Sequence, residues 1–308
     1  MTGPIERIAI VGTGAMGGMY AAHFARAGFE VELVARGERA ERLRAGLTVN
    51  AEPLVASVID IDQVQDAEPA DLLIFAVKDR HLADAITDAA AVVGPQTIIL
   101  SILNGLDSED RIAARYGNER VLLCVALGMD AEREGHQIRF RQAGRLVFGR
   151  ALNGPEPDAS VAAVQQALDR AGLAWQTPPD MRQTIWSKFY FNVGINQASA
   201  LLHAPYGAFQ ADGDARRLMK ALMTEVLQIA VAEGVGLGDQ DVARWDAVLA
   251  SMPAAGWTSM AQDTNAGRET EVETFAGRVV ALGERHAIPV PFNQAMLWAL
   301  RASHPDQA

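Results

Sequence analysis

The sequence predicts an α/β fold: a doubly wound parallel sheet in the N-terminal half, followed by an all-helical C-terminal domain. An apolar run of strand length opens the chain and leads through a glycine-rich turn into a helical pattern. Further apolar runs then alternate with helical patterns to about residue 171, which is typical of strands and crossover helices in a parallel sheet. Beyond residue 180 only helical patterns follow.

The opening turn has the pattern of a dinucleotide-binding loop. Residues 7–11 form the apolar run, and three glycines follow it at the G-x-G-x-x-G spacing. In a Rossmann-type domain the first permits the tight turn, the second lets a pyrophosphate approach the backbone, and the third lets helix and strand pack closely. The alternative is a glycine-rich turn without a ligand, but strand, turn and helix follow one another without a gap, as the motif requires. We expect this cofactor-binding loop to comprise Gly12, Gly14, Ala15, Met16 and Gly17.

Arg36 indicates which dinucleotide is bound. It follows the second predicted strand, residues 30–34. An Asp or Glu at this place accepts hydrogen bonds from the ribose hydroxyls of NAD, whereas an arginine accommodates the 2′-phosphate of NADP. The sequence therefore predicts NADP(H). Arg39 either adds a second positive charge or is an ordinary exposed arginine. The acidic residue Glu38 nearby is weak evidence against NADP(H).

The remaining strands of the first half end at polar residues. The run 71–77 precedes Lys78, a helical pattern spans 81–92, and the run 97–103 precedes Asn104. Ligands of open parallel sheets bind beyond the carboxyl ends of the strands. We therefore expect Lys78 and Asn104 to lie at the same edge of the sheet as Gly12 and Arg36, and to contact the cofactor.

The pattern changes after the run 121–127. Residues 137–140 and 146–149 are typical of a hairpin or a pair of edge strands, and 160–171 of a last helix of the first domain. Two prolines, Pro178 and Pro179, then break the chain. We place the domain boundary there, which gives a nucleotide-binding domain of residues 1–179 and a helical substrate domain of residues 180–308. Its helices are predicted at 181–202, 214–233, 240–250, 268–286 and 292–302.

Composition narrows the classes of function. The 308 residues carry a formal net charge of -11. This charge argues against a nucleic-acid partner, because binding to phosphates needs a basic surface. The one cysteine, Cys124, lies in an apolar run and allows neither an intrachain disulfide nor a zinc cluster, and no metal site is predicted. No apolar run approaches the ~18 residues that a membrane span needs, and the first strand begins too early for a signal peptide. We expect a cytoplasmic protein.

A polar stripe marks the first helix of the second half. Lys188, Asn192 and Asn196 are spaced by four residues, which puts them on one face of a helix whose other residues are mainly aromatic or aliphatic. The stripe is either an ordinary solvated face or the wall of a cleft. Gly194 weakens a helix interior by ~1 kcal/mol relative to alanine, which suggests that something approaches closely there.

These motifs together resemble the ketopantoate reductase (2-dehydropantoate 2-reductase) family, a family of pantothenate biosynthesis. The resemblance covers nearly the whole chain. It rests on the glycine loop, Val34-Ala35-Arg36, Val77-Lys78, Asn104-Gly105, the stripe that begins at Trp186-x-Lys188, and the late segments Ser259-Met260-Ala261-Gln262-Asp263 and Thr270-Glu271-Val272-Glu273. The lysine helix and the two late segments are far more specific than the glycine motif.

The resemblance implies roles for single residues. Lys188 would be the general acid and Glu271 its partner at the substrate hydroxyl, while the substrate would be held by Asn104, Asn192, Asn196 and Ser259. Hydride arriving at a ketone carbon leaves negative charge on oxygen, so a donor and a proton are needed there. Two alternatives concern the late residues: Ser259 with Gln262 also fits a helix N-terminal capping box, and Glu271 could be one of several acids on an exposed turn.

Two departures from the family put the substrate in question. Where many relatives have asparagine, this chain has Gly256 and Tyr206. A pocket lined by Tyr206, Trp257 and glycine would suit a bulkier or less hydroxylated 2-oxo acid than ketopantoate. A different class of function, a non-catalytic NADP(H)-binding redox sensor, would not need a proton donor such as Lys188. The apolar helices of the second half are compatible with pairing into a homodimer.

Overall fold

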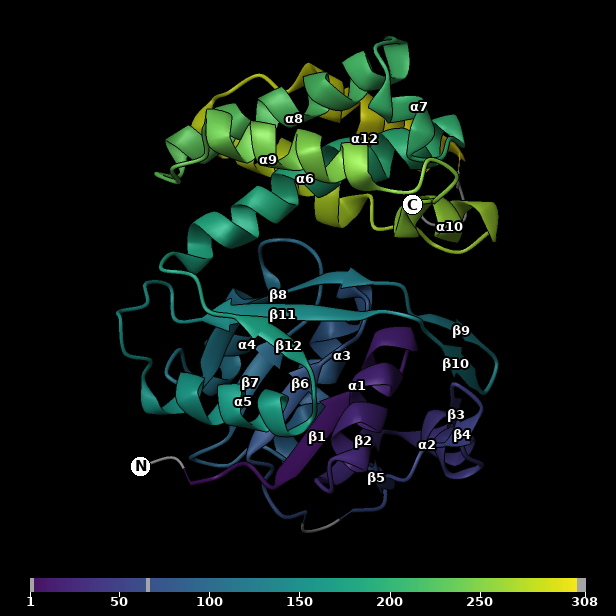
Figure 1. The fold of residues 1–308 in the computed structure, drawn as a ribbon, viewed down its shortest axis with the longest axis vertical. Helices are drawn as coiled ribbons and strands as arrows, with labels where there is room; N and C mark the ends of the chain where they lie inside the picture. Colours follow the sequence, from purple (N-terminus) through teal and green to yellow (C-terminus); the bar gives the residue numbers. More distant parts are fainter. Residues whose placement is uncertain (1–2, 65–66, 304–308) are drawn as a thin grey trace. The chain divides into compact units, whose positions relative to one another are not determined.

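The structure, a computed structural model, describes residues 3–64 and 67–303. Within them, an eight-stranded sheet has the order β12-β11-β8-β7-β6-β1-β2-β5, as Figure 1 shows. The neighbouring strands β8, β7, β6, β1, β2 and β5 all run parallel to one another. Strand β11 is antiparallel to β8, and β12 is parallel to β11. The bounds are β1 Arg7–Val11, β2 Glu30–Ala35, β5 Ser57–Asp60, β6 Leu72–Phe75, β7 Ile98–Ser101, β8 Val121–Met129, β11 Ala143–Gly149 and β12 Ala174–Gln176.

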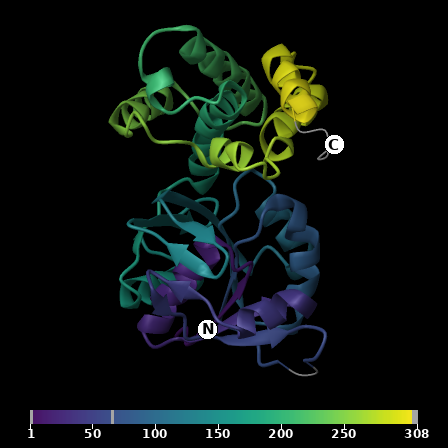
Figure 2. The same ribbon diagram turned by 90° about the vertical axis from the view of Figure 1, so that its right-hand side faces the viewer.

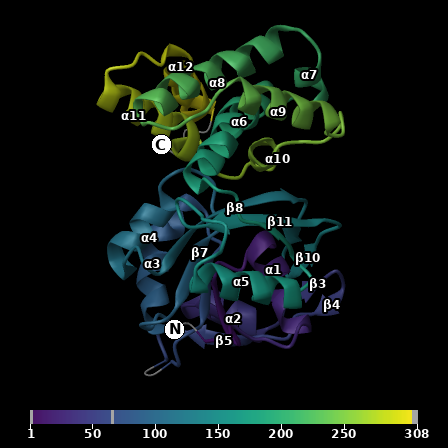
Figure 3. The same cartoon turned by 60° about the vertical axis from the view of Figure 1, so that its left-hand side comes forward.

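Helices cover both faces of this sheet (Figure 3). Alternate residues of β1 face opposite ways: Ile8 and Ile10 belong to one hydrophobic core, and Ala9 and Val11 to the other. The first core includes residues of α1 (Ala15–Arg26), α2 (Gly37–Arg44) and α5 (Ala159–Arg170), and the second residues of α3 (Leu82–Asp88) and α4 (Ser108–Tyr116). The 3-10 turns Asp79–His81 and Ala89–Ala91 flank α3. The predicted doubly wound α/β architecture is confirmed.

A second, four-stranded sheet, which we call the satellite sheet, packs beside α1. Its order is β4-β3-β10-β9, formed by β3 Thr48–Val49, β4 Glu52–Pro53, β9 Glu132–Glu134 and β10 Gln137–Arg139. The side chain of Ile138 is completely buried and lies where a Cβ at Gly18 of α1 would be. A glycine on α1 therefore allows the satellite sheet to approach the helix.

The chain divides into two compact units, Met1–Arg182 and Gln183–Ala308. The second is helical (Figure 2, green to yellow), with α6 Met181–Leu202, α7 Gly207–Gln210, α8 Asp214–Ala232, α9 Asp239–Ser251, α10 Ser259–Asn265, a π-helical turn Glu273–Gly277, α11 Arg278–His286 and α12 Pro291–Ser303. Among the described helices, none combines the length and apolar character that crossing a lipid bilayer requires. The exact domain boundary at residue 179 stays a prediction.

Several predicted elements are wrong in detail. Residues 137–140 and 146–149 form neither a hairpin nor a pair of edge strands, because β10 lies inside the satellite sheet and β11 inside the main sheet. The three-residue strand β12, which was not predicted, forms the edge of the sheet beyond β11. The helix predicted at 268–286 begins only at the π-helical turn, and the short helices α7 and α10 were not predicted.

Candidate active site

The glycine loop turns sharply between β1 and α1. Gly12 has φ of +98°, in the left-handed region that favours glycine, and a Cβ there would lie 2.6 Å from the backbone carbonyl of Ala76. A Cβ at Gly17 would collide with the carbonyl oxygen of Gly12. Strand and helix can therefore meet at this angle only with glycine at both positions.

The start of α1 suits a phosphate group. Gly14 caps the helix without any side-chain hydrogen bond, and its first turn, Ala15, Met16 and Gly17, has no acidic residue. The first N–H groups of a helix lack partners within it and favour anions. A Cβ at Gly14 would meet nothing within 4 Å, and the buried Thr13 hydroxyl has no hydrogen-bond partner among the described residues. The loop therefore fits the diphosphate of a nicotinamide dinucleotide.

The other predicted cofactor residues lie at the carboxyl ends of neighbouring strands. Arg36 follows β2, Lys78 lies beyond the end of β6, and Asn104 lies beyond the end of β7. In the sheet, β1 has β2 on one side and β6 on the other, so the chain reverses its winding at the glycine loop. Such a switch point is where open α/β sheets bind ligands. The first unit thus gathers these predicted residues at one edge.

Arg36 has an acidic neighbour that the sequence did not reveal. Its guanidinium pairs with the carboxylate of Asp88 at the end of α3. This hydrogen bond and the charge of Asp88 raise the pKa of Arg36. Half of the Arg36 side chain remains exposed, so its charge can reach a ligand but is shared with Asp88.

A buried network supports the loop that carries Asn104. The hydroxyl of Ser101 donates to that of Ser108 at 2.8 Å, which donates to the Glu109 carboxylate at 2.7 Å. The same carboxylate accepts the backbone N–H of Cys124 at 3.3 Å. Burial raises the pKa of Glu109 to about 7. The network joins β7, α4 and β8, and so fixes both ends of the loop that contains Asn104.

The polar stripe on α6 lies on an otherwise buried helix. Between residues 185 and 200, all residues are buried except Lys188 and Asn192, which are half-buried. Asn196 is 7% exposed. Within the described part of the chain, the side-chain amides of Asn192 and Asn196 make no hydrogen bond. Since polar groups in such surroundings normally find partners, these amides are available for a ligand.

Contacts on another face of α6, next to the polar stripe, fix the rotation of this helix. Ser187 donates to Asp241 of α9 at 2.7 Å and accepts from the indole N–H of Trp245 at 2.9 Å. The ring of Trp245 stacks on Phe191, with ring centroids 4.4 Å apart. Gly194 makes room for Met223 of α8. The close approach expected at Gly194 is therefore made by another helix.

Glu271 lies just before the π-helical turn, which is tied to α6. The backbone N–H of Ala276 donates to the Gln197 side chain at 3.0 Å, and the Phe275 ring lies 6.3 Å from the Phe189 ring. Glu271 is 8% exposed, so the alternative of an acid on an exposed turn is wrong. Gln197 was not predicted, since its only signal in the sequence was its place next to Asn196.

Ser259 is not a helix cap. The N-cap of α10 is Thr258, whose hydroxyl accepts the backbone N–H of Ala261 at 3.1 Å. The capping box proposed for Ser259 and Gln262 is therefore wrong. Ser259 is exposed at the first position of α10, and its hydroxyl makes no hydrogen bond with the described residues. That leaves it available for a ligand.

The two unusual residues, Tyr206 and Gly256, touch each other. The backbone N–H of Tyr206 donates to the Gly256 carbonyl at 2.9 Å. A Cβ at Gly256 would lie 3.0 Å from the Tyr206 ring. Burial raises the pKa of Tyr206. The tyrosine ring thus occupies the space that a side chain at position 256 would need.

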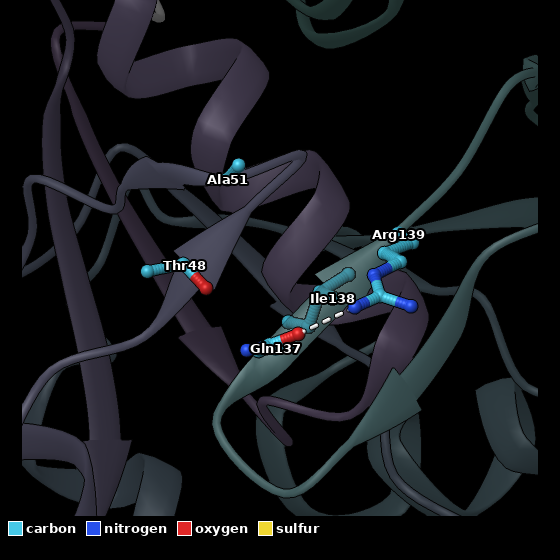
Figure 4. A pocket seen from close by; sticks show the side chains of 5 residues that line it. All are labelled: Thr48, Ala51, Gln137, Ile138 and Arg139. Atoms are coloured by element: carbon cyan, nitrogen blue, oxygen red, sulfur yellow. Dashed lines mark hydrogen bonds between the residues drawn. The ribbon is translucent and has the colours of Figure 1, made fainter.

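A pocket of about 340 Å³ lies elsewhere, on the satellite sheet (Figure 4). None of the predicted site residues lines it. Its wall includes a hydrogen bond of 2.7 Å from the Arg139 guanidinium to the Gln137 amide oxygen. Because the glycine loop and the switch point lie outside it, we do not connect this pocket with the cofactor. The described residues contain no cluster of His, Cys, Asp and Glu that could hold a metal.

Comparison with known proteins decides the family. The profile described as "Ketopantoate reductase PanE/ApbA" matches residues 8–153, and "Ketopantoate reductase PanE/ApbA C terminal" matches residues 180–304. The chain belongs to the ketopantoate reductase PanE/ApbA family. The predicted family is therefore confirmed, and with it an oxidoreductase that uses a nicotinamide cofactor.

Single members of the ketopantoate reductase family match over nearly their full length. A 2-dehydropantoate 2-reductase of Halobacterium salinarum is 29% identical, over 97% of this chain and 99% of that protein. One from Mesorhizobium japonicum is 28% identical, over 96% and 97%. A ketopantoate reductase structure from Ralstonia eutropha is 27% identical with a TM-score of 0.83, covering 97% and 99%. The fold is also that of a D-mandelate dehydrogenase solved with NADH, at 19% identity and a TM-score of 0.86.

Proposed function

We propose that this chain reduces 2-dehydropantoate (ketopantoate) to pantoate with NADPH. Family membership supports the reaction, and one observation carries it: the half-buried stripe of Lys188 and Asn192 on α6, continued by the unbonded amide of Asn196. On a helix that is buried at all other positions from 185 to 200, the amides of Asn192 and Asn196 are polar groups without a hydrogen bond in the described part of the chain, and a ligand could satisfy them. A carboxylate and a carbonyl oxygen are ligands that suit this stripe.

The proposed chemistry needs a proton donor at the substrate carbonyl. Bound NADPH supplies the hydride, which adds to the C2 carbon and leaves negative charge on the oxygen. The ammonium of Lys188 stabilises that charge and donates the proton, which completes the hydroxyl group. A carboxylate beside it, Glu271, would favour the charged form of the lysine and orient it.

The remaining predicted residues bind and position. Asn104, Asn192, Asn196 and Ser259 would hold the substrate carboxylate and hydroxyl through neutral donors, which avoids another buried charge. Arg36 and Lys78 would hold the cofactor together with the glycine loop, and Arg36 would meet the 2′-phosphate. The choice of NADP(H) over NAD(H) is part of this proposal.

A second candidate substrate has support from one contact. Since the Tyr206 ring fills the space beside Gly256, a substrate pocket that includes these residues would present an aromatic wall where many relatives have amides. A bulkier or less hydroxylated 2-oxo acid would then be preferred. The reaction and the role of Lys188 would be unchanged.

A turnover panel tests these proposals. The pure protein is mixed with NADPH and, in separate reactions, ketopantoate, an aliphatic 2-oxo acid and an aromatic 2-oxo acid, and the absorbance of NADPH is followed. We expect the highest kcat/KM with ketopantoate. A preference for the aromatic acid would favour the second candidate, and binding of NADPH without any turnover would favour a redox sensor.

We further propose that the chain forms a homodimer through its helical unit. On α12, the large apolar side chains of Phe292 and Trp298 are 50% and 63% exposed, so pairing with a second copy of the chain would remove apolar surface from water. Trp298→Lys should then shift the molar mass measured by light scattering to that of a monomer. Localisation in the cytoplasm remains a prediction from the sequence.

A further inference from the structure

Arg133 in the satellite sheet faces the glycine loop. On the antiparallel strands β9 and β10, Arg133 is directly opposite Ile138, and residues directly opposite each other project from the same face. Ile138 packs at Gly18 on α1. Arg133 therefore lies on the α1 side of the sheet, whereas Arg139, the next residue along β10, projects from the other face.

The Arg133 guanidinium is held in place but not saturated. Its Nε donates to the carbonyl of Gly135 at 2.9 Å, and its Nη1 donates to the carbonyl of Thr13 inside the glycine loop. Its Nη2 makes no hydrogen bond with the described residues. Two backbone carbonyls thus fix the orientation of the guanidinium, and Nη2 remains available to donate to a ligand.

The charges of two more arginines act on the Arg133 guanidinium. Burial is the main cause of a lowered pKa for Arg133, and the charges of Arg42 and Arg39 on α2 add to it. Within the described part of the chain, no carboxylate pairs with any of these three arginines. Like charges gathered without a counter-ion repel one another. An anion bound among them would relieve that repulsion.

The position of α2 indicates which anion this is. The helix starts at Gly37, directly after Arg36 at the end of β2, where dinucleotide-binding folds place the adenosine ribose. We propose that Arg133, with Arg39 and Arg42, joins Arg36 in binding the 2′-phosphate of NADP(H) and thereby strengthens the preference for NADPH over NADH. This inference rests on the proposed function for its cofactor. The satellite sheet, which carries Arg133, would then take part in cofactor selection.

Direct binding tests the assignment. Dissociation constants for NADPH, NADH and the fragment 2′,5′-ADP are measured on purified wild-type protein, Arg133→Met, Arg133→Lys and Arg139→Met. Because a charge-assisted hydrogen bond is lost, Arg133→Met should weaken NADPH and 2′,5′-ADP roughly tenfold or more and leave NADH within about twofold. Arg133→Lys should keep most of the preference, since it keeps the charge. Arg139→Met removes an arginine from the opposite face and should change nothing.

The outcomes separate the inference from the proposed function. Equal weakening of NADPH and NADH in Arg133→Met, or no weakening of either, would overturn the role of Arg133 even if ketopantoate is reduced. Loss of NADPH preference in Arg133→Met, in a protein that does not reduce ketopantoate, would support Arg133 and reject the proposed reaction. A wild-type protein that binds NADH more tightly than NADPH would reject the 2′-phosphate site.

Discussion

The Gln197 side-chain oxygen accepts a hydrogen bond of 3.0 Å from the backbone N–H of Ala276. This bond joins α6, which carries Lys188, to the π-helical turn that follows Glu271. The Gln197 amide nitrogen in turn donates to the carbonyl of Val193 at 2.8 Å and to Asn293 at 3.3 Å. Every polar atom of this buried side chain is therefore engaged, and the predicted acid and its predicted partner lie on segments held together by it.

Gln197→Leu should impair turnover more than cofactor binding. The substitution keeps the size of the side chain but leaves the N–H of Ala276 buried without a partner, at about 1–3 kcal/mol. The Glu271 segment would shift, so kcat should fall while the NADPH dissociation constant stays within about twofold. Gln210→Leu is the matched control, because Gln210 also donates to backbone carbonyls in this unit, at 2.9 Å and 2.8 Å. A kcat equal to that of the control would contradict the positioning role.

Glu109 should make stability depend on pH. Burial raises its pKa from an ordinary value of 4.5 to about 7, so between these values the folded state binds a proton that the unfolded state has released. The free energy of unfolding contributed by this group therefore falls as pH rises from about 5 to about 8, by roughly 1–3 kcal/mol. Denaturant melts of wild type and Glu109→Gln at both pH values measure the slope. If the free energy of unfolding falls with pH equally in wild type and Glu109→Gln, Glu109 does not cause the fall.

Tyr206 and Gly256 should be coupled energetically. Gly256→Ala places a Cβ 3.0 Å from the tyrosine ring, and overpacking of this kind costs about 1–3 kcal/mol. In a Tyr206→Ala background the same substitution should cost less. A double-mutant cycle on the free energy of unfolding measures the difference. Additive effects would mean that the tyrosine does not account for glycine at position 256.

Asp88 should weaken the binding of NADPH by Arg36. Asp88→Asn removes the negative charge but keeps a side chain of the same size, so the Arg36 guanidinium is no longer shared with a carboxylate. NADPH should bind about two- to fivefold more tightly, as expected for a half-exposed ion pair, and NADH should be unaffected. Titration at low and moderate salt checks this, since the gain should shrink with screening. Weaker NADPH binding would mean that Asp88 orients Arg36.

Long apolar runs and helical patterns were enough to predict the main elements. The apolar runs that became β1, β6 and β7 are buried on both faces, and strands of that kind are recognisable because nearly every residue is apolar. The helix predicted at 181–202 has the same bounds as α6. Elements of three to seven residues, such as β12, α7 and α10, were missed because so short a stretch contains too few residues for a period to stand out.

Contacts between distant residues could not be predicted. The satellite sheet pairs β3 with β10 in parallel, although about ninety residues separate them, and nothing in either segment specifies the other. Nothing in the sequence therefore indicated that Arg133 contacts the glycine loop or that Asp88 pairs with Arg36. The packing of Tyr206 on Gly256 was equally hidden: both residues were noted as unusual, but only the folded chain brings them together.

The Lys188→Ala variant tests the central claim most directly. With ketopantoate, kcat should fall by about 10²–10⁴-fold, the range for loss of a general acid, while the NADPH dissociation constant stays within about twofold of wild type. Lys220→Ala, which removes a lysine paired with Asp246 at 3.4 Å on the helical unit, should retain full activity. If the Lys188→Ala variant keeps the kcat of that control, Lys188 is not the proton donor and the proposed mechanism is wrong.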